Sequence, residues 1–161
     1  MLHPNGVQWD QEQAIITTVD KRVRDRRNVP PEGDKFFPGT YPNVEFKSEF
    51  LPIPVIYGDF SSGATDGVEV RAICTDTGDP KKFKVAGHRL KSIDRYSKNA
   101  QVISPSNIQN VSLSDASFEL TGVAYDSTND TFAVNCMGLE TVNSTLLTRP
   151  GDILRHILTT P

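Results

Sequence analysis

The sequence predicts a mainly β protein, an antiparallel barrel or sandwich. We expect an N-terminal amphipathic helix and an extended Pro/aromatic arm before it, and a short C-terminal helix after it. Stretches of alternating polarity recur about every ten residues between positions 53 and 138, with turn-forming residues between them, as in all-β domains. No long helical pattern separates these stretches, which argues against a parallel α/β sheet. The 161 residues fit one domain with a small extension.

Composition and motifs exclude several functional classes. No apolar run of about 18 residues predicts a membrane-spanning helix, and the N-terminal residues lack the apolar segment of a secretory signal. A formal net charge of −3 argues against nucleic-acid binding. No phosphate-binding glycine loop, zinc-protease helix or hydrolase elbow occurs, and the three histidines and two cysteines lack metal-ligand spacing. We therefore expect no enzymatic activity, no cofactor and no metal.

The first expected element is a helix over residues 10–27. Asp10 can cap it together with Gln13, and apolar residues recur at helical spacing at Ile15, Ile16, Val19 and Val23. Basic side chains gather in its second half: Lys21, Arg22, Arg24, Arg26 and Arg27. These cations form either a solvated helix C-terminus, which the macrodipole favours, or a contact for an acidic partner or a phosphate.

An extended arm is predicted over residues 28–52, which completes an N-terminal region of residues 1–52. Its prolines fix their own φ and bias the preceding residue toward extended structure. Its aromatic side chains argue against a free linker, because such side chains gain free energy by burial: Phe36, Phe37, Tyr41, Phe46 and Phe50. We expect the arm to lie either across its own domain or against a neighbouring subunit.

The β domain is predicted to span residues 53–147. Its candidate strands are residues 54–60, 68–76, 82–86, 90–96, 107–113, 117–125 and 131–137. Cys74 and Cys136 fall in two of these strands and are interpreted as buried small hydrophobes, with a mutual disulfide as the alternative. The acidic stretch at Asp126 and Asp130 lacks calcium-loop spacing and is interpreted as a hydrogen-bonded turn.

Residues 148–161 are predicted to begin a helix. Pro150 is tolerated in a first helical turn, and Asp152 suits the positive end of the helix dipole. One apolar face follows: Ile153, Leu154, Ile157 and Leu158. A helix this short is marginal alone. We expect it to dock on the β domain or, preferably, to continue in a longer parent protein.

Four segments, in this order and spacing, resemble hub and tip proteins of long-tailed bacteriophages. Residues 51–59 (LPIPVIYGD) resemble a PIPxxYG segment, and residues 83–94 (FKVAGHRLKSID) are similar to a KVADHxIKxID block. Residues 116–122 (ASFELTG) resemble an asFxLtG strand, and residues 148–154 (TRPGDIL) resemble an NPADIIRDLL helix. Asp59 departs from the pattern, because members often carry Arg there, and Pro-Gly replaces Pro-Ala in the last segment.

The resemblance covers about three quarters of the chain and implies a structural virion protein, a baseplate hub or tail-tip component. Such a protein is made in the bacterial cytoplasm and assembles into a homo-oligomeric ring, a trimer or hexamer. The ring connects the tail tube to distal tail parts by contacts with other phage tail proteins. It acts by assembly and not by catalysis.

Under this hypothesis the arm is an intersubunit contact, with Phe36, Phe37 and Tyr41 as anchors. The interface candidates are Phe36, Phe37, Tyr41, Phe46, Phe50, Arg22, Arg24, Arg26 and Arg27. The alternative function is a carbohydrate-binding β module for cell-surface recognition, although the one tryptophan, Trp9, lies outside the β region. A third hypothesis is an enzyme with a carboxylate pair such as Glu45 and Glu49, for which no motif is present.

Overall fold

The computed structural model describes residues 7–9, 14–16, 35–63, 68–140 and 145–159. The chain divides into two compact units, Met1–Glu32 and Gly33–Pro161. In the first unit, β1 (Val7–Trp9) pairs antiparallel with β2 (Ala14–Ile16), with Trp9 opposite Ala14.

This hairpin corrects part of the predicted N-terminal helix. The sequence predicted helix at Ile15 and Ile16, but both residues lie in β2. Their β-branched side chains are stiff at χ1, which favours a strand when another strand is available for pairing. The rest of the predicted helix falls at residues 10–13 and 17–27, which lie outside the described residues.

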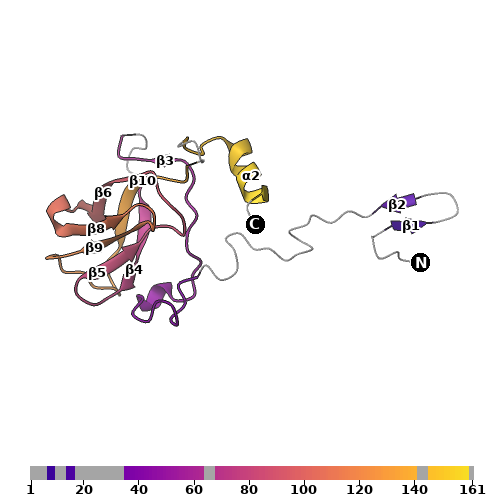
Figure 1. The fold of residues 1–161 in the computed structure, drawn as a ribbon. Helices are drawn as coiled ribbons and strands as arrows, with labels where there is room; N and C mark the ends of the chain where they lie inside the picture. The colour runs from indigo at the N-terminus through magenta and orange to yellow at the C-terminus, as the bar shows by residue number, and fades with distance from the viewer. Residues whose placement is uncertain (1–6, 10–13, 17–34, 64–67, 141–144, 160–161) are drawn as a thin grey trace. The chain divides into compact units, whose positions relative to one another are not determined.

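The second unit is an eight-stranded antiparallel sheet, which confirms the mainly β prediction. The strands are β3 (Asp59–Phe60), β4 (Val70–Asp76), β5 (Lys81–Lys84), β6 (Ser92–Lys98), β7 (Gln101–Val102), β8 (Ile108–Ser112), β9 (Ser117–Leu120) and β10 (Phe132–Met137). Their order is β7-β6-β10-β4-β5-β9-β8, with β3 paired to β10. The sheet curls strongly into a half-barrel (Figure 1).

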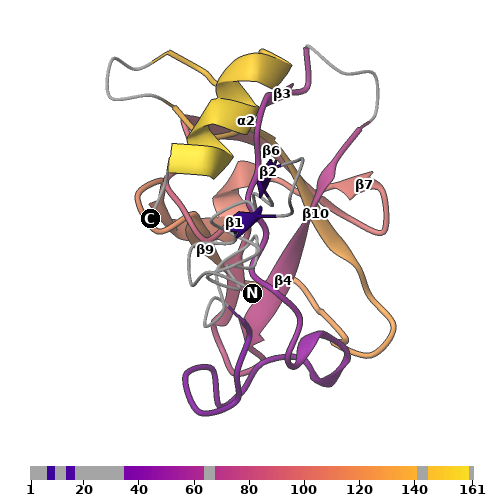
Figure 2. The ribbon, with the colours of Figure 1, turned by 90° about the vertical axis from the view of Figure 1, so that its right-hand side faces the viewer.

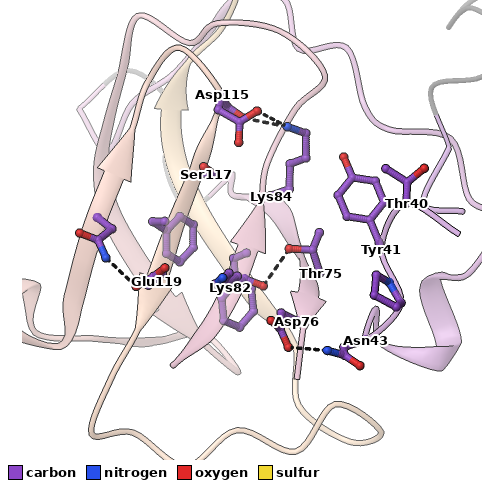
Figure 3. A pocket seen from close by; sticks show the side chains of 14 residues that line it. Thr40, Tyr41, Asn43, Thr75, Asp76, Lys82, Lys84, Asp115, Ser117 and Glu119 are labelled. Carbon is purple, nitrogen blue, oxygen red and sulfur yellow. Dashed lines mark hydrogen bonds and ion pairs between the residues drawn. The ribbon is translucent and has the colours of Figure 1, made fainter. Parts of the chain in front are cut away.

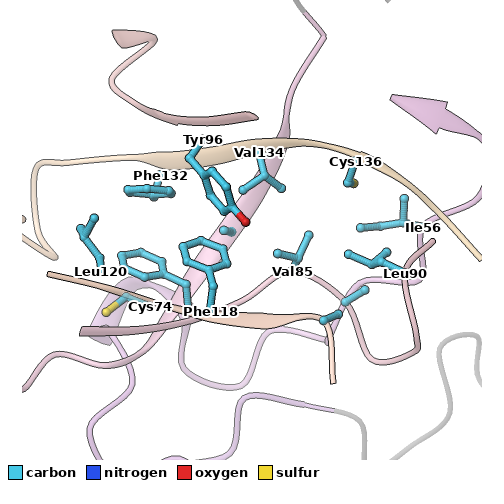
Figure 4. Packing of buried hydrophobic residues seen from close by; sticks show 14 of the residues in the cluster. Ile56, Cys74, Val85, Leu90, Tyr96, Phe118, Leu120, Phe132, Val134 and Cys136 are labelled. Atoms are coloured by element: carbon cyan, nitrogen blue, oxygen red, sulfur yellow. The ribbon is translucent and has the colours of Figure 1, made fainter. Parts of the chain in front are cut away.

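The core lies inside this curl. Strands β6 and β10 supply one side of it, and β5 and β9 supply the other (Figure 4). Phe83 is at the centre, because its ring centroid lies 5.3 Å from that of Phe118, 4.6 Å from that of Phe132 and 5.1 Å from that of Tyr125. Alternation of inward and outward side chains along β9 and β5 produces this packing.

Two predicted strands are shorter than expected by more than half of their length. The stretch predicted at residues 54–60 is a strand only at β3, although its backbone is paired elsewhere: the Leu139 N–H donates to the Ile56 carbonyl oxygen at 2.9 Å. The stretch predicted at residues 117–125 ends at Leu120 because Gly122 turns the chain with a φ of +67°. The short strand β7 was not predicted.

The C-terminal region contains α2 (Pro150–Thr159), as predicted. It lies at the end of the sheet near β3, and the 3₁₀ turn η1 (Phe46–Ser48) lies at the opposite end (Figures 1 and 2). The Tyr57 hydroxyl and His156 Nδ1 are 3.0 Å apart and join the helix to the rest of this unit. In the described part of the chain, no helix has the length and apolar character needed to cross a bilayer.

Candidate functional site

Residues 35–52, hereafter the arm, fold back so that their two ends pair with each other. Lys35 and Pro52 form an antiparallel bridge, and the Phe36 N–H donates to the Leu51 carbonyl oxygen at 2.9 Å. Tight turns between these ends provide hydrogen-bond partners for further backbone N–H and C=O groups of the arm. The arm is therefore a closed loop, and its turn-rich sequence does not form a free linker.

The middle of the arm pairs with β4. Asn43 forms a parallel bridge with Asp76, and the Glu45 N–H donates to the Cys74 carbonyl oxygen at 3.0 Å. Strand β10 pairs with β4 only as far as Ala72, so the arm covers backbone groups that the second half of β4 would otherwise expose. Of the two placements predicted for the arm over residues 28–52, residues 35–52 adopt the one across their own domain, and residues 28–34 lie outside the described residues.

One side of the arm forms a second, smaller core. Phe36 is fully buried there with Val44, Ile53 and Ile73, and the Tyr41 ring packs on it with ring centroids 5.6 Å apart. Phe36 was predicted as an intersubunit anchor, but it has no exposed surface in this conformation. It instead fixes the arm to its own domain, and Tyr41 is half-buried beside it.

A buried carboxylate also attaches the arm. The Glu45 side chain is 1% exposed and accepts hydrogen bonds from the Ser48 hydroxyl at 2.6 Å, Arg71 Nη2 at 3.0 Å and the Tyr125 hydroxyl at 2.7 Å. Burial and the adjacent Glu45 charge raise the pKa of Tyr125, so its hydroxyl stays protonated and donates. Three donors and full burial give Glu45 a structural role and no access to a substrate.

Three rings of the arm remain exposed. Phe37 and Phe50 meet edge to face with ring centroids 5.9 Å apart, and they are 53% and 57% exposed. Phe46, in η1, is 86% exposed. Phe50 also has a φ of +62°, a conformation that bulky residues rarely adopt. Strain of this kind tends to persist at functional positions, and large exposed apolar side chains mark interaction sites, so the three exposed rings are the candidate interaction surface.

A groove of about 330 Å³ lies between the arm and the outer face of the sheet (Figure 3). The arm supplies Tyr41 and Asn43, and β4 supplies Asp76. The paired neighbouring strands β5 and β9 supply Lys82 and Glu119, which are opposite each other in register. The groove therefore combines an aromatic ring, an amide, carboxylates and an ammonium group.

Other chemically suggestive residues have structural roles. Cys74 and Cys136 are buried free thiols, which confirms the interpretation as small hydrophobes over the disulfide. The Asp126 carboxylate accepts the Thr128 N–H at 2.9 Å, which confirms the predicted turn. Within the described ranges, no three His, Cys, Asp or Glu side chains gather in a way that could hold a metal ion.

The structure brings together only part of the predicted interface. Phe37, Phe46 and Phe50 are exposed, while Phe36 is buried. The four predicted arginines, Arg22, Arg24, Arg26 and Arg27, lie outside the described residues. Sequence reasoning missed the groove, although side-chain alternation along the strands that contain Lys82 and Glu119 could have placed both residues on a polar face.

Comparisons of the chain with models of protein families, with curated proteins and with solved structures gave no match.

Proposed function

We propose that this chain is a structural component of a phage tail, a baseplate hub or tail-tip protein that assembles into a ring. The observation that carries this proposal is the exposure of Phe37, Phe46 and Phe50 on an arm that is otherwise well anchored. The order of the four phage-like segments supports the tail assignment. The function requires no catalytic group, because a folded domain with an exposed apolar surface is enough for assembly.

The arm is a better candidate interface than the sheet edges. Edge strand β7 has two residues, and edge strand β8 has a register shift between Gln109 and Ser112 with a positive φ at Asn110. Short edges and bulges are the features by which sheets avoid pairing with other chains. The exposed rings show no such protection, so contact between subunits is expected at the arm.

The energetics of the three rings fit an obligate contact. Full burial of one large apolar side chain contributes about 1.5–3 kcal/mol relative to exposure, and a few aromatic anchors dominate a typical interface. The backbone that carries them is fixed by the Phe36 core and by Glu45, so little ordering is required on association. Pre-organised rings of this kind favour tight, oriented packing between copies.

Light scattering tests the assembly. The 161-residue chain of 17.8 kDa should form particles with a mass near three or six times its own, which should appear as closed rings by electron microscopy. The triple variant F37S/F46S/F50S should be a monomer with an unchanged circular dichroism spectrum. The matched control is V102S/V111S, which removes exposed apolar residues from the two edge strands and should leave the oligomer intact.

A monomeric wild-type chain at all concentrations would contradict assembly, and an oligomer in the triple variant would contradict the arm as its interface. The tail assignment has its own test. Antibodies against this chain should label the distal end of tails released from the bacterium that encodes it, and unlabelled tails would exclude a virion role.

A further inference from the structure

The groove described above is built on the polar face of the sheet. Its floor is formed by outward side chains of β4, β5 and β9, and the arm forms one wall at Tyr41 and Asn43 (Figure 3). The Tyr41 ring is supported from behind by Phe36, at 5.6 Å between centroids, so it is a fixed wall of the groove. The volume of the groove, about 330 Å³, is at the lower end of the usual range for small-molecule sites.

The carboxylates of the groove are held in place by neighbours. Asp76 accepts a hydrogen bond from Asn43 at 3.2 Å, and Glu119 accepts one from Asn110 at 2.7 Å. Asp115 pairs with Lys84 Nζ at 2.8 Å. Each carboxylate keeps acceptor capacity beyond these bonds, because an ionised carboxylate has about four lone-pair sites. The groove thus offers oriented acceptors without a need for rearrangement.

Lys82 supplies the complementary donor. It is exposed and lies in register between Asp76 on β4 and Glu119 on β9. Among the described residues, its ammonium group has no hydrogen-bond or ion-pair partner, and the Tyr41 hydroxyl has none either. Both groups border the same groove, so a ligand there would meet two donors beside several acceptors.

We propose that this groove binds a neutral saccharide. Sugar hydroxyls both donate and accept hydrogen bonds, and the C–H face of a sugar ring can pack on an aromatic wall such as Tyr41. An anionic ligand fits less well, because Lys82 and Lys84 share the groove with three carboxylates, Asp76, Asp115 and Glu119. Saccharide binding adds a recognition function to the assembly role and does not depend on it.

The direct test uses the 161-residue chain and an array of immobilised neutral and anionic oligosaccharides, followed by titration with the neutral oligosaccharide that binds most tightly. Lys82→Ala and Tyr41→Phe each remove one donor from the groove, so each should weaken binding about tenfold. Lys81→Ala is the matched control, because Lys81 is on the same strand but does not line the groove. It should bind like the wild type.

Lys82→Ala changes an exposed side chain, so its circular dichroism spectrum and oligomer mass should be those of the wild type. Neutral-sugar binding that both variants weaken and the control does not would support the proposal. Binding to anionic sugars alone, binding that neither variant affects, or no binding at millimolar sugar would each overturn it. None of these outcomes bears on the assembly proposal, because that proposal is tested by the mass of the oligomer in light scattering.

Discussion

The hydroxyl of Tyr125 donates a hydrogen bond of 2.7 Å to the carboxylate of Glu45, across 80 residues of sequence. Glu45 belongs to the arm, and the Tyr125 ring packs in the main core against Phe83, at 5.1 Å between centroids. One buried bond therefore links the arm to the centre of the β domain. The arm is an integral part of the fold, and this explains how it can present exposed rings in a fixed orientation.

Replacement of Glu45 should destabilise the domain strongly. In Glu45→Ala the hydroxyls of Tyr125 and Ser48 lose a buried acceptor, so the free energy of unfolding should fall by about 3 kcal/mol. The ion pair with Arg71 adds little to this figure, because the Arg71 side chain is 44% exposed. Urea unfolding followed by circular dichroism measures the change.

Glu45→Gln is the matched control for that prediction. It keeps the shape and one acceptor oxygen, so its loss of stability should be smaller than that of Glu45→Ala. Tyr125→Phe should cost about 1 kcal/mol, the value of one hydrogen bond. A Glu45→Ala protein as stable as the wild type would show that this network does not hold the arm.

Acid should weaken the attachment of the segment around Ile56. The Ile56 N–H donates to His88 Nε2 at 2.8 Å, so Nδ1 carries the hydrogen and donates to the Arg89 carbonyl oxygen at 2.8 Å. Burial lowers the pKa of His88, and nearby His156 lowers it further, while the Arg89 bond opposes both. Protonation of Nε2 would place a second donor against the Ile56 N–H.

The sign of this effect follows from proton linkage. The unfolded chain binds a proton on His88 at higher pH than the folded chain does, so stability is complete above about pH 6.5 and falls as the pH drops through the lowered folded pKa. Urea unfolding between neutral and mildly acidic pH should show this loss. His88→Gln keeps an acceptor without titrating and should flatten the slope; an equally steep slope would assign the effect to other groups.

Sequence patterns predicted much of the fold because strand alternation is local. The alternation in Phe118 and Leu120 was enough to place β9, and the turn at Asp126 followed from its own residues. The pairing of Glu45 with Tyr125 could not be predicted, since it depends on the curl of a sheet between positions far apart in sequence. The same holds for Lys82, whose place beside the arm is set by tertiary packing.

Adjacent aromatic residues show this limit clearly. Phe36 and Phe37 are the same residue type at adjacent positions, so the sequence does not distinguish them. Phe36 is nevertheless fully buried, and Phe37 is 53% exposed. Their difference comes from Ile53 and Ile73, which provide a core on one side of the arm only. At Ile15 and Ile16, helical spacing of apolar residues was outweighed by pairing with another strand.

The two cysteines should be inert in the folded protein. Burial raises the pKa of Cys74 to about 12 and that of Cys136 to about 11, so almost no thiolate is present near neutral pH. Iodoacetamide at mildly alkaline pH should label neither residue in the native chain and both in urea, as read by mass spectrometry. Rapid labelling of either cysteine in the native protein would contradict its burial.

A methyl group at Gly138 should disrupt the contact between the end of β10 and the segment before β3. The Gly138 N–H donates to the Gly58 carbonyl oxygen at 2.9 Å, and a Cβ on Gly138 would lie 2.4 Å from the Ile56 carbonyl oxygen. The obstructing atom belongs to the backbone, so relief requires a shift of the chain, and Gly138→Ala should lower the free energy of unfolding by about 1–3 kcal/mol. Gly151→Ala, in α2, is the control, because a Cβ there meets nothing within 4 Å and alanine favours helix. Urea unfolding should show a lower free energy of unfolding for Gly138→Ala than for Gly151→Ala. Equal values would mean that the backbone around Gly138 accommodates a Cβ without loss of stability.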